Sequence, residues 1–234
     1  MRAVVAPMLL LLLAACGSPG VTTTTPTPVP TAPPSATSTR APVVTRSALA
    51  PSPDLLAFPP NSGVALDIGR YSSQPPFDLA FSFEIAEEGW ATAHHHADFL
   101  DVIQPVATGV LPTRWVAFAR PQTLHGTGEI DAAGLTPADV VAAFESRGDI
   151  DIGESTPYEI GGLAGLSVDI STDESDVKPF GGPGGDFELD PSYDGRMVVV
   201  SVADAPLLVL VLAPEGQLRD AWADSEAIVD SITW

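Results

Sequence analysis

Two neighbouring segments near the C-terminus constrain the fold more than any other part of this 234-residue chain. Residues 197–202 (MVVVSV) and 207–212 (LLVLVL) are almost continuously apolar, and the sequence between them, Ala203-Asp204-Ala205-Pro206, is typical of a turn. The two runs therefore predict a β-hairpin. Because neither run alternates with polar residues, both faces of these strands are expected to be buried, which places them at the centre of a sheet.

The remaining regular structure is predicted to consist mostly of short strands. The clearest is 77–85, where apolar residues alternate with polar ones. Others are expected at 63–68, 99–103 and 115–119, with a hairpin at 158–170 that turns at Gly161-Gly162.

Two helices are predicted in the second half of the chain. Thr136 followed by Pro137 is typical of an N-cap and a first helical residue, and Gly148 suits the position after the helix end. A second helix is expected at about 215–230. The predicted fold is therefore α+β, a mainly antiparallel β-sheet with one or two helices packed on a face.

Three segments are expected to lack regular structure. Residues 91–98 contain three consecutive histidines and are predicted to form a loop, and residues 120–134 carry a proline and several glycines. Residues 172–195 are acidic and rich in glycine and proline, which is typical of a surface loop.

The first 53 residues differ in composition from the rest of the chain. Ala3 to Leu13 is an apolar run that follows Arg2, and it is shorter than the roughly 20 residues that cross a bilayer. It is typical of a signal peptide. Residues 17–53 are rich in proline, threonine and serine and contain no acidic residue, which predicts a disordered linker with a reach of up to ~100 Å. We therefore expect a signal peptide at 1–15, Cys16 and a linker at 16–53, and one acidic domain at 54–234.

The junction of these segments resembles the bacterial lipobox. It reads Leu13-Ala14-Ala15-Cys16, and Cys16 is the only cysteine of the chain, so no disulfide explains it. The resemblance implies that Cys16 becomes lipid-modified after cleavage and holds the protein on the extracytoplasmic face of the cell membrane. The alternative is an ordinary secretory signal in which Cys16 is incidental.

The charge of the domain limits its partners. All 30 acidic residues and seven of the ten basic residues lie after residue 53, which gives the domain a formal net charge of −23. Such a surface repels nucleic acid and anionic lipid headgroups. An envelope protein or a small-molecule ligand is the expected partner, besides the membrane that the N-terminal lipid enters.

His94, His96 and Asp98 form the candidate metal site. In an extended segment His94 and His96 share one face while His95 points away. Imidazole nitrogens bind zinc, copper or nickel, and Asp98 can add an oxygen ligand. The alternative is a solvated polar loop. No calcium site is predicted at 186–197, because Pro191 and Met197 stand where an EF-hand loop needs glycine and glutamate.

The domain resembles uncharacterised bacterial secreted and lipoprotein domains, which are loosely similar to PsbP-like proteins. The residues that carry the resemblance are Phe83–Trp90, Leu135–Phe144, Ile160–Gly165 and Ala227–Ile232. It implies an α+β fold and a binding or accessory role without catalysis. The sequence shows no catalytic constellation, phosphate-binding loop or cofactor motif, and a metal ion is the one cofactor that its residues suggest. We therefore expect a non-catalytic envelope lipoprotein or, alternatively, a metal-binding one that uses 94–96.

Overall fold

The computed structural model describes residues 55–105 and 112–234. The predicted signal peptide, Cys16 and the linker up to residue 53 lie outside the described residues, and those expectations stay predictions. The strands are β1 Leu55–Ala57, β2 Gly69–Ser72, β3 Ser82–Ile85, β4 Ala91–His95, β5 Phe99–Gln104, β6 Arg114–Ala119, β7 Thr123–His125, β8 Glu129–Asp131, β9 Asp151–Ile152, β10 Thr156–Ile160, β11 Leu163–Ser171, β12 Val177–Gly182, β13 Gly185–Leu189, β14 Tyr193–Val202 and β15 Ala205–Pro214. The helices are α1 Pro137–Glu145 and α2 Leu218–Asp230.

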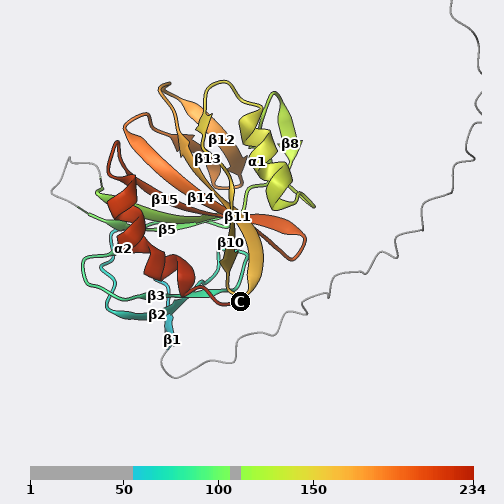
Figure 1. Cartoon of the computed structure of the whole chain (residues 1–234). Helices are drawn as coiled ribbons and strands as arrows, with labels where there is room; N and C mark the ends of the chain where they lie inside the picture. Colours follow the sequence, from blue (N-terminus) through green and yellow to red (C-terminus); the bar gives the residue numbers. More distant parts are fainter. Residues whose placement is uncertain (1–54, 106–111) are drawn as a thin grey trace, which may run out of the picture. The chain divides into compact units, whose positions relative to one another are not determined.

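An eight-stranded sheet forms the middle of the domain (Figure 1). Its strands follow the order β10-β11-β14-β15-β6-β5-β4, and β9 pairs with β11 at the side. Every pairing in it is antiparallel. The hairpin predicted from the two apolar runs is β14 and β15, and these strands lie in the interior of the sheet. The prediction of a mainly antiparallel α+β fold is confirmed.

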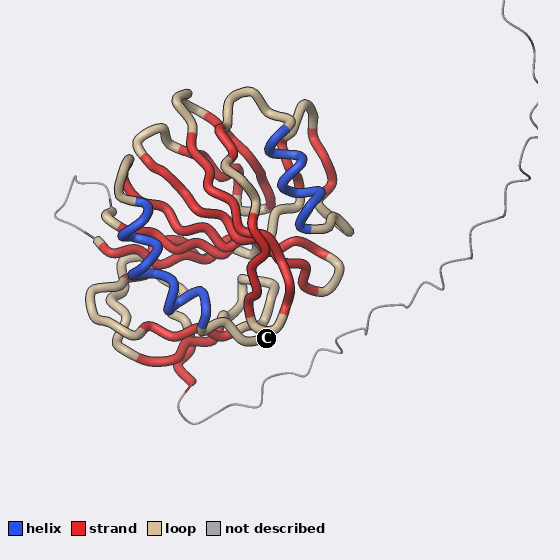
Figure 2. The backbone as a smooth tube through the Cα atoms, viewed as in Figure 1, coloured by secondary structure: helices blue, strands red, loops and turns tan. Residues whose placement is uncertain are grey.

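The sheet separates two hydrophobic cores, and its strands contribute to both. Val198 and Val200 of β14 face one core, whereas Met197 and Val199 face the other. The first core is covered by α2 together with β2 and β3, and the second is covered by α1 together with β7 and β12. The two helices thus lie on opposite faces of the sheet, as Figure 2 shows. This double coverage is why β14 and β15 have no polar face.

Two smaller sheets complete the layers. The first has the order β1-β2-β3, with β1 parallel to β2, and the second has the order β13-β12-β7-β8 with antiparallel pairs. The three segments expected to be irregular were predicted wrongly. Residues 91–95 form β4, residues 123–131 form the β7–β8 hairpin, and residues 177–189 form the β12–β13 hairpin. Conversely, the strand expected at 63–68 is reduced to a single bridge between Ala65 and Ala91.

The predicted strand 77–85 is a strand only at Ser82–Ile85, whereas two other local sequence signals are confirmed. Thr136 caps α1 by accepting a hydrogen bond from the Asp139 amide, and the Asp139 carboxylate accepts one from the Thr136 amide in return. Gly161 and Gly162, with φ of +56° and +79°, form the turn between β10 and β11. In the described part of the chain, neither helix is long and apolar enough to cross a membrane.

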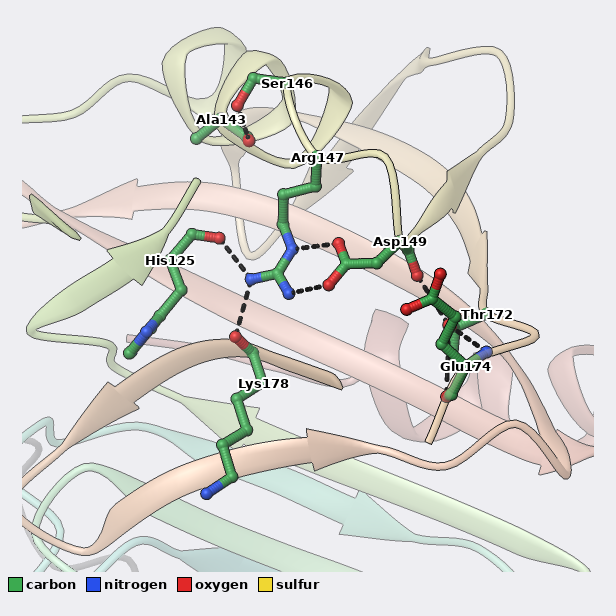
Figure 3. Close-up of polar contacts among 8 residues, drawn as sticks. All are labelled: His125, Ala143, Ser146, Arg147, Asp149, Thr172, Glu174 and Lys178. Carbon is green, nitrogen blue, oxygen red and sulfur yellow. Dashed lines mark hydrogen bonds and ion pairs between the residues drawn. The ribbon is translucent and has the colours of Figure 1, made fainter. Parts of the chain in front are cut away.

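Arg147, just after α1, ties three elements together (Figure 3). Its guanidinium donates to both carboxylate oxygens of Asp149, at 2.7 and 2.5 Å. It also donates to the backbone carbonyls of His125 on β7, at 2.5 Å, and Lys178 on β12, at 2.8 Å. The Arg147 side chain is only 9% exposed, and its hydrogen bonds to Asp149 lower the pKa of that carboxyl group. This cluster fixes the end of α1 against the sheet that contains the β12–β13 hairpin.

Candidate functional site

The histidine cluster lies on β4 and in the turn to β5, at one edge of the central sheet. The β4–β5 pairing is irregular between Thr92 and His95, which is typical of a β-bulge. His95 lies against Phe58 of the first core, with ring centroids 5.3 Å apart, and one of its ring nitrogens is 2.8 Å from the Gln74 carbonyl oxygen. His94 and His96 line a pocket on the opposite face. The predicted separation of His95 from the other two histidines is confirmed.

A buried carboxylate holds His94 in place. Asp101 of β5 has no exposed surface, and its Oδ2 lies 2.9 Å from Nδ1 of His94. The same oxygen accepts a hydrogen bond of 2.7 Å from Nε1 of Trp115 on β6, and Oδ1 accepts one from the His94 backbone amide. The hydrogen bond to Asp101 raises the pKa of His94. This hydrogen bond also fixes the orientation of the ring. The other ring nitrogen of His94, Nε2, takes no part in the contact with Asp101.

The pocket has a volume of about 290 Å³, close to the lower end of the range for small-molecule sites. Four aromatic rings line it, those of Phe99, Trp115, Phe180 and Phe187. Phe187 connects them: its ring stacks on Phe180 with centroids 4.8 Å apart, and lies 5.8 Å from Phe99 and 6.1 Å from Trp115. The walls are therefore mainly apolar and rigidly packed.

Three carboxylates add negative charge to these walls. Asp98 lies in the turn between β4 and β5, whereas Asp186 and Glu188 lie on the edge strand β13, on either side of Phe187. Asp186 is 3.6 Å from the Lys178 ammonium and 3.8 Å from His125 Nε2. Among the residues that the structure describes, no arginine or lysine lines this pocket.

The β12–β13 turn closes the pocket by packing on Asp98. The Gly184 amide donates a 3.0 Å hydrogen bond to Asp98 Oδ1, and Asp98 is only 8% exposed. A Cβ atom on Gly182 would lie 2.0 Å from Asp98 Oδ2, and one on Gly184 would lie 2.6 Å from Oδ1. The glycines at 182 and 184 are therefore needed for close approach of the backbone to a side chain.

A second hollow adjoins the first. It has a volume of about 630 Å³ and shares Asp98 and Pro121 with the aromatic pocket. Its lining is more polar and includes Glu129, Asp131 and the ion pair of Arg120 with Asp78, at 3.1 Å. With fewer apolar walls and no aromatic ring among the described residues of its lining, it fits a small organic ligand less well than the first pocket does.

The structure brings the three predicted metal-binding residues to one pocket. The rings of His94 and His96 lie 6.1 Å apart, and Asp98 is engaged by the Gly184 amide. Within residues 55–105 and 112–234, no group of three or more histidine, aspartate, glutamate or cysteine side chains is placed to hold a metal ion. Metal binding by His94 and His96 stays a prediction.

The residues that sequence reasoning missed come from other strands. Asp101 stands between Leu100 and Val102 in an apolar strand, and an acid in such a position is a signal for a buried, partnered carboxylate. Trp115 and Phe187 carry no comparable signal, because a buried aromatic ring is ordinary core. Among the described residues, those that line the aromatic pocket include no serine, threonine, cysteine, tyrosine or lysine. The polar side chains of the pocket are therefore imidazoles and carboxylates.

Comparison with known proteins gives structural neighbours only. No family model and no curated protein matches the chain. A crystal structure from Bacteroides thetaiotaomicron matches at a TM-score of 0.40 and 10% identity, over 70% of this chain and 47% of that one, so this chain spans about half of its length. The cyanobacterial PsbP of Synechocystis (CyanoP) matches at 0.38 and 13%, over 73% and 94%. LpqN of Mycobacterium tuberculosis, described as involved in cell envelope biogenesis, matches at 0.35 and 11%, over 71% and 90%. At such scores we base no conclusion about function on these neighbours.

Proposed function

We propose that the protein is a non-catalytic binding module of the cell envelope, anchored through Cys16, and that its domain holds a small ligand in the aromatic pocket. The observation that supports this role is the pocket itself, a cavity of about 290 Å³ with four aromatic rings and one oriented imidazole. Sites for small ligands are typically concave and mostly apolar, with a few fixed polar groups. His94 supplies such a group, because Asp101 holds one of its ring nitrogens and leaves the other for a ligand.

A neutral aromatic probe tests the pocket. We expect 1-naphthylmethanol to bind and to shift the imidazole NMR resonances of His94 and His96, but not that of His95, which lies on the other face of the sheet. Phe187→Leu removes the ring that joins Phe180, Phe99 and Trp115, so it should weaken binding about threefold to tenfold.

Phe144→Leu is the matched control for this variant. Phe144 of α1 is buried in the same core but does not line the pocket, so the substitution should leave the affinity for the probe unchanged. An absence of shifts at His94 and His96 at millimolar probe would overturn the assignment of this pocket as a ligand site.

The membrane anchor has its own test. We expect mass spectrometry of the mature protein to find an acylated Cys16 at the N-terminus. The variant Cys16→Ser cannot carry the acyl chains that stable anchoring requires, so it should move from the detergent phase to the aqueous phase. A Cys16→Ser variant that stays with the membrane would contradict lipid anchoring at this residue.

Metal binding is a second candidate function, and the observation that favours it is the placement of His94 and His96 in one pocket. Titration calorimetry with zinc, copper and nickel tests it. Heat that is lost in the double variant His94→Gln, His96→Gln would support this function, and no uptake at micromolar metal would exclude it.

A further inference from the structure

We infer that the aromatic pocket selects a small organic cation, a protonated or quaternary amine attached to an apolar body. This inference rests on the proposed function, that the pocket binds a small ligand, and adds the charge that the ligand carries. It combines two properties of the same cavity. The walls present aromatic rings, and the charged groups at the cavity are carboxylates.

The aromatic walls suit a cation because the face of an aromatic ring is electronegative. A cation within about 6 Å of a ring centroid is attracted to that face, most strongly to tryptophan. Trp115 and Phe99 are only partly buried, so each ring keeps exposed surface. Trp115 is also held rigidly, since its indole nitrogen donates to Asp101. A ligand ammonium placed here meets ring faces that are already ordered.

The carboxylates that line the pocket also favour a positively charged ligand. Glu188 and Asp186 are exposed on β13, next to the buried Phe187. Lys178 lies near Asp186 and partly compensates its charge, whereas no basic side chain of the described residues forms an ion pair with Glu188. Glu188 thus lines the pocket without such compensation, and the overall charge of −20 adds a long-range attraction of the same sign.

The carboxylates at the pocket outnumber its two imidazoles, those of His94 and His96, so its negative charge does not depend on the protonation state of His94. When the imidazole is protonated, it and Asp101 together carry no net charge, and when it is neutral the pair carries one negative charge. Asp98, Asp186 and Glu188 are added in both states. An anionic ligand would meet these carboxylates at close range in a partly desolvated cavity, which is unfavourable. Neutral ligands lack the attraction altogether.

A charge series on one aromatic body tests the inference. At pH about 7.5 the amine of 1-naphthylmethylamine is protonated, 1-naphthylmethanol is neutral and 1-naphthylacetate is anionic. By titration calorimetry we expect the amine to bind about tenfold more tightly than the alcohol. The acetate should bind most weakly. Raising the salt concentration from about 0.05 M to about 0.5 M should reduce the advantage of the amine and leave the alcohol unchanged.

Two variants locate the effect. Glu188→Gln should weaken binding of the amine about threefold or more and leave the alcohol unchanged, because it removes charge but little volume. Glu129→Gln removes the same charge from the neighbouring hollow and should change neither affinity.

The outcomes separate the two proposals. An alcohol that binds as tightly as the amine would overturn the cation preference and leave the pocket as a ligand site. Binding of the amine that depends on Glu129 and not on Glu188 would place the cation in the neighbouring hollow and so overturn the inference. Failure of all three compounds to bind would overturn the proposed function itself.

Discussion

Asp101→Ala is expected to lower the free energy of unfolding by about 2–4 kcal/mol, because it removes a buried carboxylate that three donors share. The Nε1 of Trp115 and the backbone amide of His94 would both lose their acceptor inside the sheet layer. The His94 side chain is half exposed, so water can replace part of the hydrogen bond that its ring loses. Urea unfolding followed by circular dichroism measures the change.

Asp101→Asn keeps the size of the side chain and separates packing from charge. The amide supplies one acceptor oxygen, so we expect a smaller loss of stability than in the alanine variant. Because the hydrogen bond to Asp101 is the main cause of the raised pKa of His94, this pKa should fall toward the ordinary histidine value, and NMR titration of the imidazole would show it. Asp173→Asn, at an exposed position, is the control. An alanine variant as stable as the parent would contradict the anchoring role of Asp101.

Arg147→Ala is expected to lower the free energy of unfolding by about 2–3 kcal/mol. The guanidinium is nearly buried, and its removal leaves the Asp149 carboxylate and the carbonyls of His125 and Lys178 without this donor. Because Lys178 belongs to β12, the variant should also loosen the hairpin that closes the aromatic pocket, and binding of 1-naphthylmethanol should weaken.

Arg147→Lys tests the geometry of this cluster. An ammonium cannot donate in parallel to both Asp149 oxygens and reach two carbonyls as well, so lysine should recover less than half of the lost stability. Arg219→Ala, on the exposed face of α2, should change the stability by less than about 0.5 kcal/mol. A fully stable lysine variant would show that charge alone, and not the planar guanidinium, holds the cluster.

The two stability predictions concern the same site from opposite sides. Asp101 fixes the wall that belongs to the central sheet, and Arg147 fixes the hairpin that closes over it. Ligand affinity should therefore be sensitive to residues that touch no ligand, since the pocket exists only where these two layers meet.

Much of the fold could be predicted from local patterns. The continuous apolar runs of β14 and β15 require burial on both faces, and the structure provides a core on each side. The capped start of α1 at Thr136 and the turn at Gly161-Gly162 depend on short-range backbone chemistry, which a sequence displays directly.

Local patterns failed where a strand has few apolar residues of its own. Strand β4 reads ATAHH, and its hydrogen bonds to β5 rather than its composition make it a strand. The hairpin of β12 and β13 carries four glycines and two prolines, which are typical of loops, yet two of these glycines, Gly182 and Gly184, let its turn approach Asp98. Both errors hid parts of the pocket.

The sequence by itself predicts the layout of the chain, an apolar leader, a lipid-bearing cysteine, an acid-free linker and one strongly acidic domain, and it determined that the domain consists of mainly antiparallel strands with two helices. It also singled out His94, His96 and Asp98 as neighbours, because they are close along the chain. Only the tertiary structure decided what surrounds them. Asp101, Trp115 and Phe187 lie on three strands that pair or pack across long sequence separations, and such contacts are set by the packing of layers and not by local composition.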